Sequence, residues 1–205
     1  MKNILLLLFI LKGIVMAIEE PNYKIIEKND AFEIREYESY IIAQMQVIGN
    51  FDEVGEQAFP ILFKYISGEN RKGEKIEMTA PVIQENTKQK GEKIEMTAPV
   101  IQEMDTKNSQ KKFFSFVMPI KYTLATIPRP LDARISIKEI PAKKIAVRIF
   151  SGFWNEENYT ENQDILLEEL YKANIKTIGT VKLARYNSPF SIWFMRRNEI
   201  MIEMQ

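Results

Sequence analysis

The sequence contains no cysteine and no histidine. Without them the chain cannot form a disulfide, a thiolate nucleophile, a Cys/His zinc site, or a Ser–His or Cys–His pair. The commonest general base near neutral pH is also missing. Carboxylate or Ser/Lys chemistry remains possible, but no spacing singles out a carboxylate. We therefore expect a binding protein rather than an enzyme, with no catalytic residue and no metal site.

Net charge is also lacking, because 28 Lys and Arg residues balance 28 Asp and Glu residues. A nucleic-acid-binding protein needs a basic patch or stripe, so no nucleic-acid partner is expected. The 205 residues, 45% of them hydrophobic, are enough for one domain with a core. The sequence does not indicate an oligomeric state.

The N-terminal residues have the pattern of a signal peptide. Lys2 precedes an apolar run from Ile4 to Leu11, and Val15 and Ala17 suit the −3 and −1 positions of a cleavage site. The alternative is an uncleaved anchor, but the longest uncharged run is shorter than the roughly 20 residues that a membrane span needs. We expect residues 1–17 to be removed, residues 18–205 to form the domain, and the product to be periplasmic or secreted.

Two segments 103 residues apart resemble each other. Phe32–Gly49 and Ile135–Gly152 are both 18 residues long and are identical at five positions: Ile34/Ile137, Glu36/Glu139, Ile42/Ile145, Ala43/Ala146 and Gly49/Gly152. Each segment predicts two short strands, followed by a helix and two more strands. The sequence therefore predicts an α+β domain built from two diverged copies of one unit.

The helices and later strands are predicted from periodicity and capping residues. The first helix is expected at 52–67, with Asp52 as N-cap and Gly68 after its end. The second is expected at 161–173, where Thr160 and Gln163 form a capping box. The remaining strands are expected at 76–82, 113–119, 181–186 and 192–204.

A second repeat is recent. Lys72–Glu85 and Lys90–Glu103 both read KGEKIEMTAPVIQE, at an offset of 18 residues. One unit needs only one such strand, so one copy is surplus. The even offset lets either copy enter the sheet with the same face inward. Our hypothesis is that the first copy occupies the sheet and that 86–110 is a loop containing the second.

Phe63 stands apart from the rest of the first helix. The core-facing stripe comprises Phe51, Val54, Ala58, Leu62, Tyr65 and Ile66, and Phe59 lies at its flank. Phe63 falls outside that stripe. It either packs under a loop or a chain end, or it forms part of an exposed apolar shelf for a ligand.

Aromatic and basic residues adjoin near the C-terminus. Phe190, Trp193 and Phe194 precede Arg196 and Arg197. One interpretation pairs an arginine with Glu199 or with helix-end carbonyls and buries the aromatics. The other has these residues hold a flat, acidic, apolar molecule.

At these residues the chain resembles the SOUL haem-binding protein family. The resemblance lies in six blocks in family order: AFPILFKYISGEN (58–70), KIEMTAPV (75–82), FFSFVMP (113–119), IPRP (127–130), IAVRIFSG (145–152) and RRNEIMIEM (196–204). It implies a distorted antiparallel β-barrel flanked by two helices, with pseudo-twofold symmetry. It also implies that haem or another tetrapyrrole binds by apolar contact between the first helix and the loop before the last strand.

The resemblance and the residues together suggest a ligand-binding set: Val54, Phe59, Phe63, Lys64, Phe190, Trp193, Arg196 and Arg197. Glu56 and Ser191 stand where family members carry arginine or lysine. Some members are proposed to ligate iron with histidine; here Met, Tyr or Lys would have to serve, or no residue would. The alternative function is a non-haem effector-binding or interaction module, since the duplicated architecture also resembles small-molecule-binding domains of some bacterial regulators.

Overall fold

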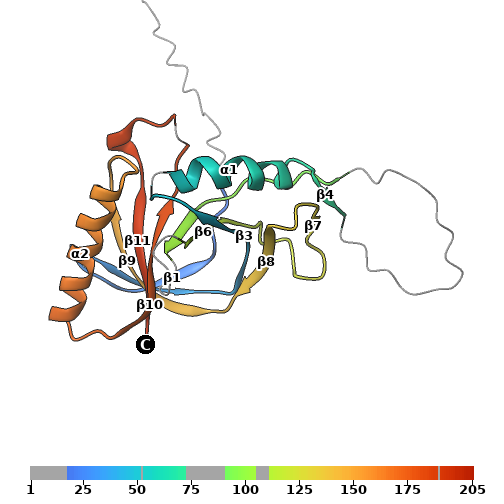
Figure 1. The fold of residues 1–205 in the computed structure, drawn as a ribbon. Helices are drawn as coiled ribbons and strands as arrows, with labels where there is room; N and C mark the ends of the chain where they lie inside the picture. The colour runs from blue at the N-terminus through green and yellow to red at the C-terminus, as the bar shows by residue number, and fades with distance from the viewer. Residues whose placement is uncertain (1–17, 52, 73–90, 105–110, 189) are drawn as a thin grey trace, which may run out of the picture.

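A computed structural model of the chain describes residues 18–51, 53–72, 91–104, 111–188 and 190–205. Within these ranges, nine strands form one curled antiparallel sheet, a half-barrel on which two helices pack (Figure 1). The predicted α+β class is thus confirmed.

The first half of the chain holds β1 (Tyr23–Lys28), β2 (Glu33–Tyr37), β3 (Tyr40–Ile48), α1 (Glu53–Ile66), β4 (Asn70–Arg71), β5 (Val100–Met104) and β6 (Lys111–Val117). The second half holds β7 (Arg129–Pro130), β8 (Ile135–Ile140), β9 (Lys143–Phe150), α2 (Glu156–Lys172), β10 (Thr177–Arg185), the 3₁₀ turn η1 (Trp193–Met195) and β11 (Asn198–Met204). The short strands β4 and β7 pair with each other outside the main sheet.

Apart from the edge strand β1, the order of strands in the sheet is symmetric. It runs β1-β2-β9-β11-β10-β5-β6-β3-β8, so β2-β9-β11-β10 mirrors β8-β3-β6-β5. Ile34 pairs with Ala146. The residue 103 positions after Ile34 is Ile137, the residue 103 positions before Ala146 is Ala43, and these two also pair. The 103-residue repeat is therefore the pseudo-twofold of the fold. The halves also exchange strands, because β2 pairs with β9 and β8 pairs with β3.

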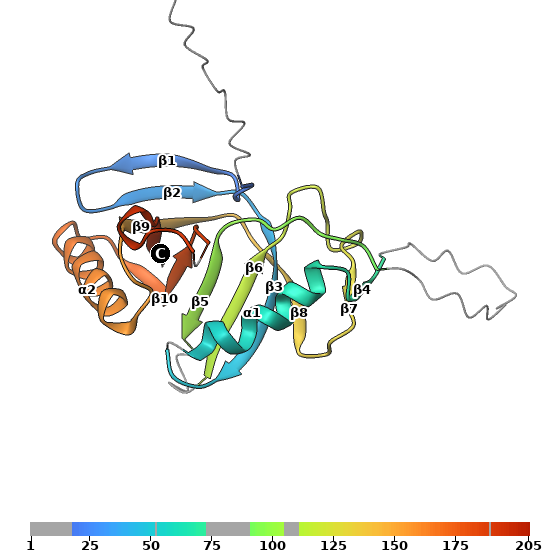
Figure 2. The same cartoon turned by 90° about the horizontal axis from the view of Figure 1, so that it is seen from above.

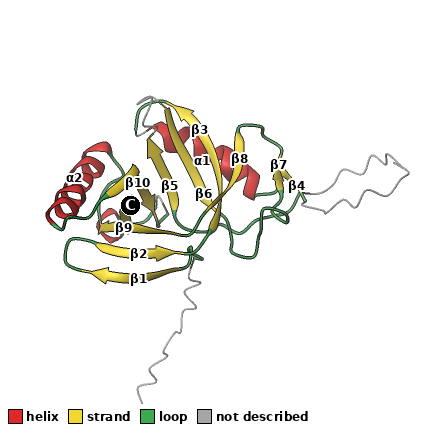
Figure 3. Cartoon of the chain, turned by 90° about the horizontal axis from the view of Figure 1, so that it is seen from below, coloured by secondary structure: helices red, strands yellow, loops and turns green. Residues whose placement is uncertain are grey.

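Each helix covers its own half of the sheet. α1 packs on β3 and β6, and α2 packs on β9 and β11 (Figure 2). The buried residues of α1 are Val54, Ala58, Leu62, Tyr65 and Ile66, all from the predicted stripe. Gly68, with a φ of +116°, follows the end of α1 as predicted. Asp52 lies outside the described residues. From below, the strands curl between the two helices (Figure 3).

The predicted start of the second helix is wrong. α2 begins at Glu156, five residues before the predicted Glu161, and Asn155 is its N-cap, accepting a hydrogen bond from the Asn158 amide. Thr160 is an exposed residue inside the helix. The earlier start is stabilised by two acidic residues in the first turn and by burial of Tyr159 in the core.

The last two strands also differ from prediction. β10 begins at Thr177 rather than Val181, and β11 begins at Asn198 rather than Ile192. The segment predicted as the first part of the last strand contains η1, where the Met195 amide donates to the Ile192 carbonyl. The four consecutive apolar residues 192–195 form an exposed turn here, because the partner strand β9 ends at Phe150, opposite Asn198.

The hypothesis that the second copy of the recent repeat lies in a loop is wrong. Val100–Met104 forms β5, between β10 and β6, so 86–110 is not wholly a loop. Upstream of β5, Ile94 is 2% exposed, and its amide donates to the Ile66 carbonyl at the end of α1. Asn70 bonds both the amide and the carbonyl of Glu92. The strand predicted at 76–82 lies outside the described residues.

A cluster of charged residues, buried at its centre, lies where the two halves meet. Arg35 on β2 donates two hydrogen bonds to Glu199 on β11, at 2.9 and 3.0 Å. The side chains of Arg35 and Glu199 are 1% and 0% exposed. Arg35 also pairs with Glu33 at 2.6 Å, and Arg197 pairs with Glu199 at 2.8 Å. Lys28 and Glu20 complete the cluster, pairing with Glu33 and Arg197 respectively, so three cations meet three carboxylates.

Buried tyrosines lie against these charges, and the charges shift the pKa values of the tyrosines. Burial is the largest single influence on Arg35 and opposes its charged form, but Glu199, Tyr37 and Glu33 together outweigh it and raise the pKa of Arg35. Burial, followed by the charge of Glu199, raises the pKa of Tyr37 to about 12. The same two causes raise the pKa of Tyr186, whose hydroxyl donates to Glu199 at 2.8 Å. Both phenols are therefore held protonated in the folded protein.

The two copies of the recent repeat provide a matched pair of substitutions. Ile94→Ala removes a core side chain, and we expect it to lower the free energy of unfolding by about 2–4 kcal/mol. Ile76→Ala makes the same change in the other copy and is expected to cost less than about 1 kcal/mol, because β5 already fills the place between β10 and β6. Urea denaturation measures both, and a larger loss for Ile76→Ala would contradict the assignment.

The buried phenols predict loss of stability at alkaline pH. The pKa of Tyr37 is raised from 10.0 to about 12, so the unfolded chain releases this proton at lower pH than the folded protein. Its contribution is present below pH 10 and is lost as the pH rises toward 12, at most about 3 kcal/mol for a shift of two units. Thermal unfolding between about pH 9 and about pH 12 should show Tyr37→Phe losing less stability than the wild type. If the stabilities of the two proteins fell in parallel with pH, Tyr37 would not be the cause of the loss.

Candidate ligand-binding site

A hollow of about 460 Å³ lies between α1 and the segment that follows β9. It is lined by Gly55, Glu56, Phe59, Val100, Phe114, Trp154, Arg185 and Asn187. Most of this lining is apolar, and the volume falls within the range of small-molecule sites. A side chain at position 55 would reduce the hollow, because a Cβ there would lie 3.2 Å from Arg185 Nη1 and 3.7 Å from Phe114.

Trp154 forms one end of the hollow and is held in a fixed orientation. Its indole N–H donates to Asn198 Oδ1 at 2.6 Å, at the first residue of β11. The guanidinium of Arg196 lies 4.3 Å from the ring centroid, and that of Arg185 lies 5.4 Å away. Arg185 also donates to Gln102 on β5 at 2.6 Å. Positive charge and an aromatic surface thus adjoin at this end.

In the described part of the chain, the place beside α2 that corresponds to this hollow is filled, although the two halves are related. A shift of 103 residues takes Glu56 to Tyr159 and takes Trp154 back to Phe51. Tyr159 and Phe51 are 5% and 2% exposed, with ring centroids 4.9 Å apart. Two packed rings therefore stand beside α2 at the positions that correspond to the glutamate and the indole beside α1. The duplication has diverged into one half with a hollow and one half with a filled core.

Three of the predicted residues lie together on α1. Phe59 lines the hollow, and its ring stacks on Phe63 with centroids 5.9 Å apart. Phe63 is 46% exposed, which agrees with the exposed shelf rather than with packing under a loop. Lys64 is exposed beside it. Val54 is fully buried in the core under α1 and does not reach the surface.

The predicted ligand-binding residues of the C-terminal half lie in three different places. Phe190 and Trp193 are 95% and 48% exposed on the loop between β10 and β11, so the interpretation that buries them is wrong. Arg196 lies over Trp154 and donates to the Ser191 carbonyl. Arg197 pairs with Glu199, as that same interpretation held. Of these four predicted residues, Arg196 alone is shown in contact with a lining residue of the hollow, Trp154.

Of the lining residues, the sequence predicted only Phe59 as a ligand contact, and Glu56 was noted only as a departure from the family pattern. The other six were not predicted as ligand contacts: Gly55, Val100, Phe114, Trp154, Arg185 and Asn187. One signal was available, because Trp154 follows the conserved end of the 103-residue repeat at the place that Phe51 holds in the first copy. Arg185 and Val100 are paired across β10 and β5, a pairing that only the strand order reveals.

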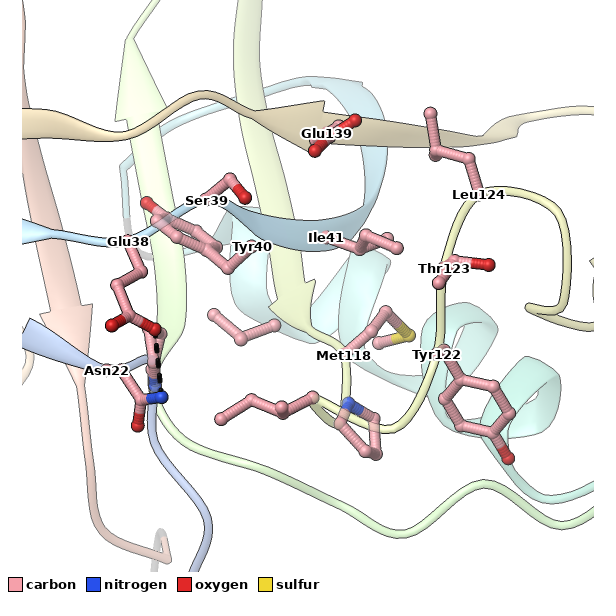
Figure 4. Close-up of a pocket in the computed structure, with 14 residues that line it drawn as sticks. Asn22, Glu38, Ser39, Tyr40, Ile41, Met118, Tyr122, Thr123, Leu124 and Glu139 are labelled. Carbon is pink, nitrogen blue, oxygen red and sulfur yellow. Dashed lines mark hydrogen bonds between the residues drawn. The ribbon is translucent and has the colours of Figure 1, made fainter.

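Other hollows suit a tetrapyrrole less well. One of about 250 Å³ lies between the start of β3 and the segment after β6, and Glu38, Glu139 and Thr123 face it along with apolar residues (Figure 4). It is smaller than typical ligand sites. Another, of about 490 Å³, is lined by charged residues that include Lys24, Glu36 and Lys143. The walls of both are less apolar than that of the hollow beside α1.

The hollow beside α1 offers no obvious ligand to iron. Its lining contains no Met, Tyr or Lys, the residue types that the sequence left for this purpose. In the described part of the chain, no group of three or more Asp and Glu side chains is placed to hold a metal ion. The same part contains no helix long and apolar enough to cross a membrane.

Similar solved structures share the fold at low sequence identity. The EcmrR C-terminal domain matches with a TM-score of 0.58 at 11% identity, covering 89% of this chain and 98% of that domain. A hydrolase from Listeria innocua matches with a TM-score of 0.52 at 7% identity, covering 88% and 94%. These likenesses establish the architecture and nothing about the ligand.

Sequence comparison gives a more specific result. Heme-binding protein 2 of Mus musculus is 26% identical over 209 residues, covering 91% of this chain and 90% of the relative. The protein of the same name from Homo sapiens is 27% identical over 200 residues, covering 89% and 88%. The family model described as SOUL heme-binding protein matches residues 18–90 and 83–203, and its two matches overlap within the recent repeat. The chain belongs to the SOUL heme-binding protein family.

Proposed function

We propose that this protein binds a flat, largely apolar tetrapyrrole such as haem in the hollow beside α1. The observation that carries the proposal is the apolar hollow closed at one end by Trp154, with two guanidinium groups beside the indole. The family description and the names of the relatives support haem as the ligand class. They name binding and no reaction, and the role proposed here is to hold or carry the ligand.

Apolar contact provides most of the proposed affinity. A tetrapyrrole supplies a flat apolar ring with carboxylates at its edge. The aromatic residues Phe59 and Phe114 line the hollow, and Val100 adds an aliphatic side chain. Removing such surface from water contributes about 25 cal/mol per Å².

Charge orients the ligand in this proposal. Arg185 and Arg196, at the Trp154 end, favour the carboxylates there, since guanidinium groups match carboxylate geometry. Glu56 lines the same hollow and offsets part of that positive charge. The ligand is therefore expected to lie with its carboxylates away from Glu56.

Iron is expected to add little to binding. The lining residues offer no nitrogen or sulfur side-chain ligand of the kinds that hold haem iron. The same fact favours the second candidate function, a module that binds a flat ligand without iron. Haem and an iron-free ring therefore need to be compared directly.

The test is a titration with haemin and with iron-free protoporphyrin, followed by absorbance and tryptophan fluorescence. We expect both to bind with affinities within about tenfold, since the difference would reflect iron ligation alone. An unshifted Soret band and unquenched fluorescence at micromolar haemin would end the proposal. Binding of haemin alone would show that an iron ligand exists outside the lining described above.

The variant Gly55→Leu tests whether the ligand occupies this hollow. Its side chain should enter the hollow and weaken binding of both ligands at least about tenfold, while the helix accepts leucine better than glycine. Gln57→Leu adds the same side chain at an exposed position on α1 and serves as the control. Equal affinities of the two variants would place the ligand elsewhere.

Export is a further part of the proposal, and it rests on the sequence of residues 1–17 alone. A charged start, an apolar run and small residues at Val15 and Ala17 are the features that a signal peptidase recognises. We expect the mature chain to begin at Ile18. Intact-mass measurement of protein recovered from the exported fraction would check this, and a full-length mass from the cytoplasm would contradict it.

A further inference from the structure

In the described part of the chain, one face of the sheet packs against no helix. Side chains alternate between the two faces of a strand, so Ile41 of β3 packs in the cluster beneath α1, whereas Ile42 packs in a cluster without helix residues. In Figure 3, α1 lies behind β3 and β6, on the other side of the sheet. We call the face without a helix the open face, and it carries Ile42, Gln44, Ile101, Phe113, Ser115 and Lys138.

Two adjoining hollows lie on the open face. The first, of about 230 Å³, spans the neighbouring strands β10, β5, β6, β3 and β8. The second, of about 280 Å³, shares Glu103, Phe113 and Lys182 with the first and continues to Met104 and Ile178. Together the two hollows reach the size of a small-molecule site.

The floor of the first hollow is a chain of hydrogen-bond donors. Lys138 Nζ donates to Gln44 Oε1 at 2.7 Å, and Gln44 Nε2 donates to Ser115 Oγ at 3.2 Å. Gln44 and Ser115 are only 7% and 2% exposed, and Lys138 lies exposed at the rim. Beside them Lys182 pairs with Glu103 at 3.2 Å, but among the described residues Lys138 has no carboxylate within ion-pair distance. Ammonium, amide and hydroxyl donors thus converge where the described chain supplies no anion.

The residue that corresponds to Lys138 in the other copy of the 103-residue repeat is a paired cation. That residue is Arg35, on the first strand of its segment as Lys138 is on the first strand of the other. Arg35 forms its buried ion pair with Glu199. A strictly symmetric fold would therefore place a carboxylate within reach of Lys138.

The strand register shows which residue stands in the place of that carboxylate. Glu199 on β11 lies opposite Ile149 on β9. The residue 103 positions before Ile149 is Gln46, and its partner on β6 is Phe113. Lys138 Nζ accordingly lies 5.6 Å from the centroid of the Phe113 ring. The duplication has kept the cation and replaced its anion by an apolar ring.

We propose that a small monocarboxylate with an apolar chain binds on the open face, with its carboxylate at Lys138 and its chain over Phe113. The ligand then supplies the negative charge that Glu199 supplies in the other half. Gln44 and Ser115 donate to the same carboxylate, and the second hollow receives the end of the chain. One unmatched ammonium fits a single negative charge, whereas a phosphate monoester carries nearly two.

This site is separate from the hollow beside α1. Val100 lines that hollow and Ile101 lines the open face, and consecutive residues of a strand point to opposite faces. The proposal therefore does not depend on tetrapyrrole binding.

The probe is octanoate, and octanamide has the same chain without the charge. In a titration of the full chain followed by methyl NMR, octanoate should shift the signals of Ile42, Ile101 and Ile140 and leave that of Val100 in place. We expect octanamide to bind at least about tenfold more weakly, because it lacks the charge-assisted bonds.

Lys138→Met removes the ammonium and keeps an apolar side chain. It should lower the affinity for octanoate at least about tenfold, to that for octanamide. The matched control, Lys172→Met, removes an exposed ammonium on α2 and should bind octanoate as the wild type does.

Reversing the charge gives a result that a structural role of the lysine would not give. Lys138→Glu should reject octanoate and bind octylammonium in its place. Phe113→Glu reproduces the arrangement of the other half, and its carboxylate should pair with the retained ammonium and weaken octanoate binding.

Four outcomes would overturn the inference. They are equal binding of octanoate and octanamide, no methyl shift at millimolar octanoate, and equal losses in Lys138→Met and Lys172→Met. The fourth is loss of octanoate binding in Gly55→Leu but not in Lys138→Met, which would place octanoate in the hollow beside α1. Haemin titration of Lys138→Met should match the wild type, so the two ligand proposals stand or fall separately.

Discussion

The pairing of Arg35 with Glu199 is the constraint on which the rest of this structure depends. The two side chains are 1% and 0% exposed, and a buried charge is tolerated only when it is paired. Arg35 lies on β2 and Glu199 on β11, so the pair links a strand of each half. Removing one partner of such a pair typically costs about 3–5 kcal/mol. Asn198, next to Glu199, accepts the hydrogen bond from Trp154. The same pair therefore fixes the strand that orients the wall of the hollow.

Exchange of strands between the halves explains how one duplicated unit gives one domain. Because β2 pairs with β9 and β8 with β3, neither half can complete its part of the sheet alone. The symmetry then broke at the helix faces. Tyr159 and Phe51 fill the space beside α2, whereas Glu56 and Trp154 leave a hollow beside α1. Binding capacity arises where packing is incomplete, since a close-packed core leaves no room for a ligand.

The sequence predicted the fold well because its signals were periodic and repeated. The 103-residue offset and the apolar stripe of α1 both reflect side chains that are buried on one face of an element, and the fold depends on that burial. The start of α2 was missed because Thr160 and Gln163 imitate a capping box inside a helix whose upstream turn is held by Asn155 and Tyr159. Local capping patterns can be overridden by packing, which sequence spacing does not show.

By itself, the sequence determined the class of the domain, its two related halves, the helix face that carries Phe59 and Phe63, and the absence of histidine or cysteine chemistry. These follow from composition and from periodicity along the chain. Only the tertiary structure decided which copy of the recent repeat supplies β5, because the two copies are identical and only packing separates them. It also decided that Arg197 belongs to the buried cluster, whereas Arg185 and Trp154 form the end of the hollow. These assignments depend on strands far apart in the sequence lying side by side, and contacts of that kind leave no periodic trace in the chain.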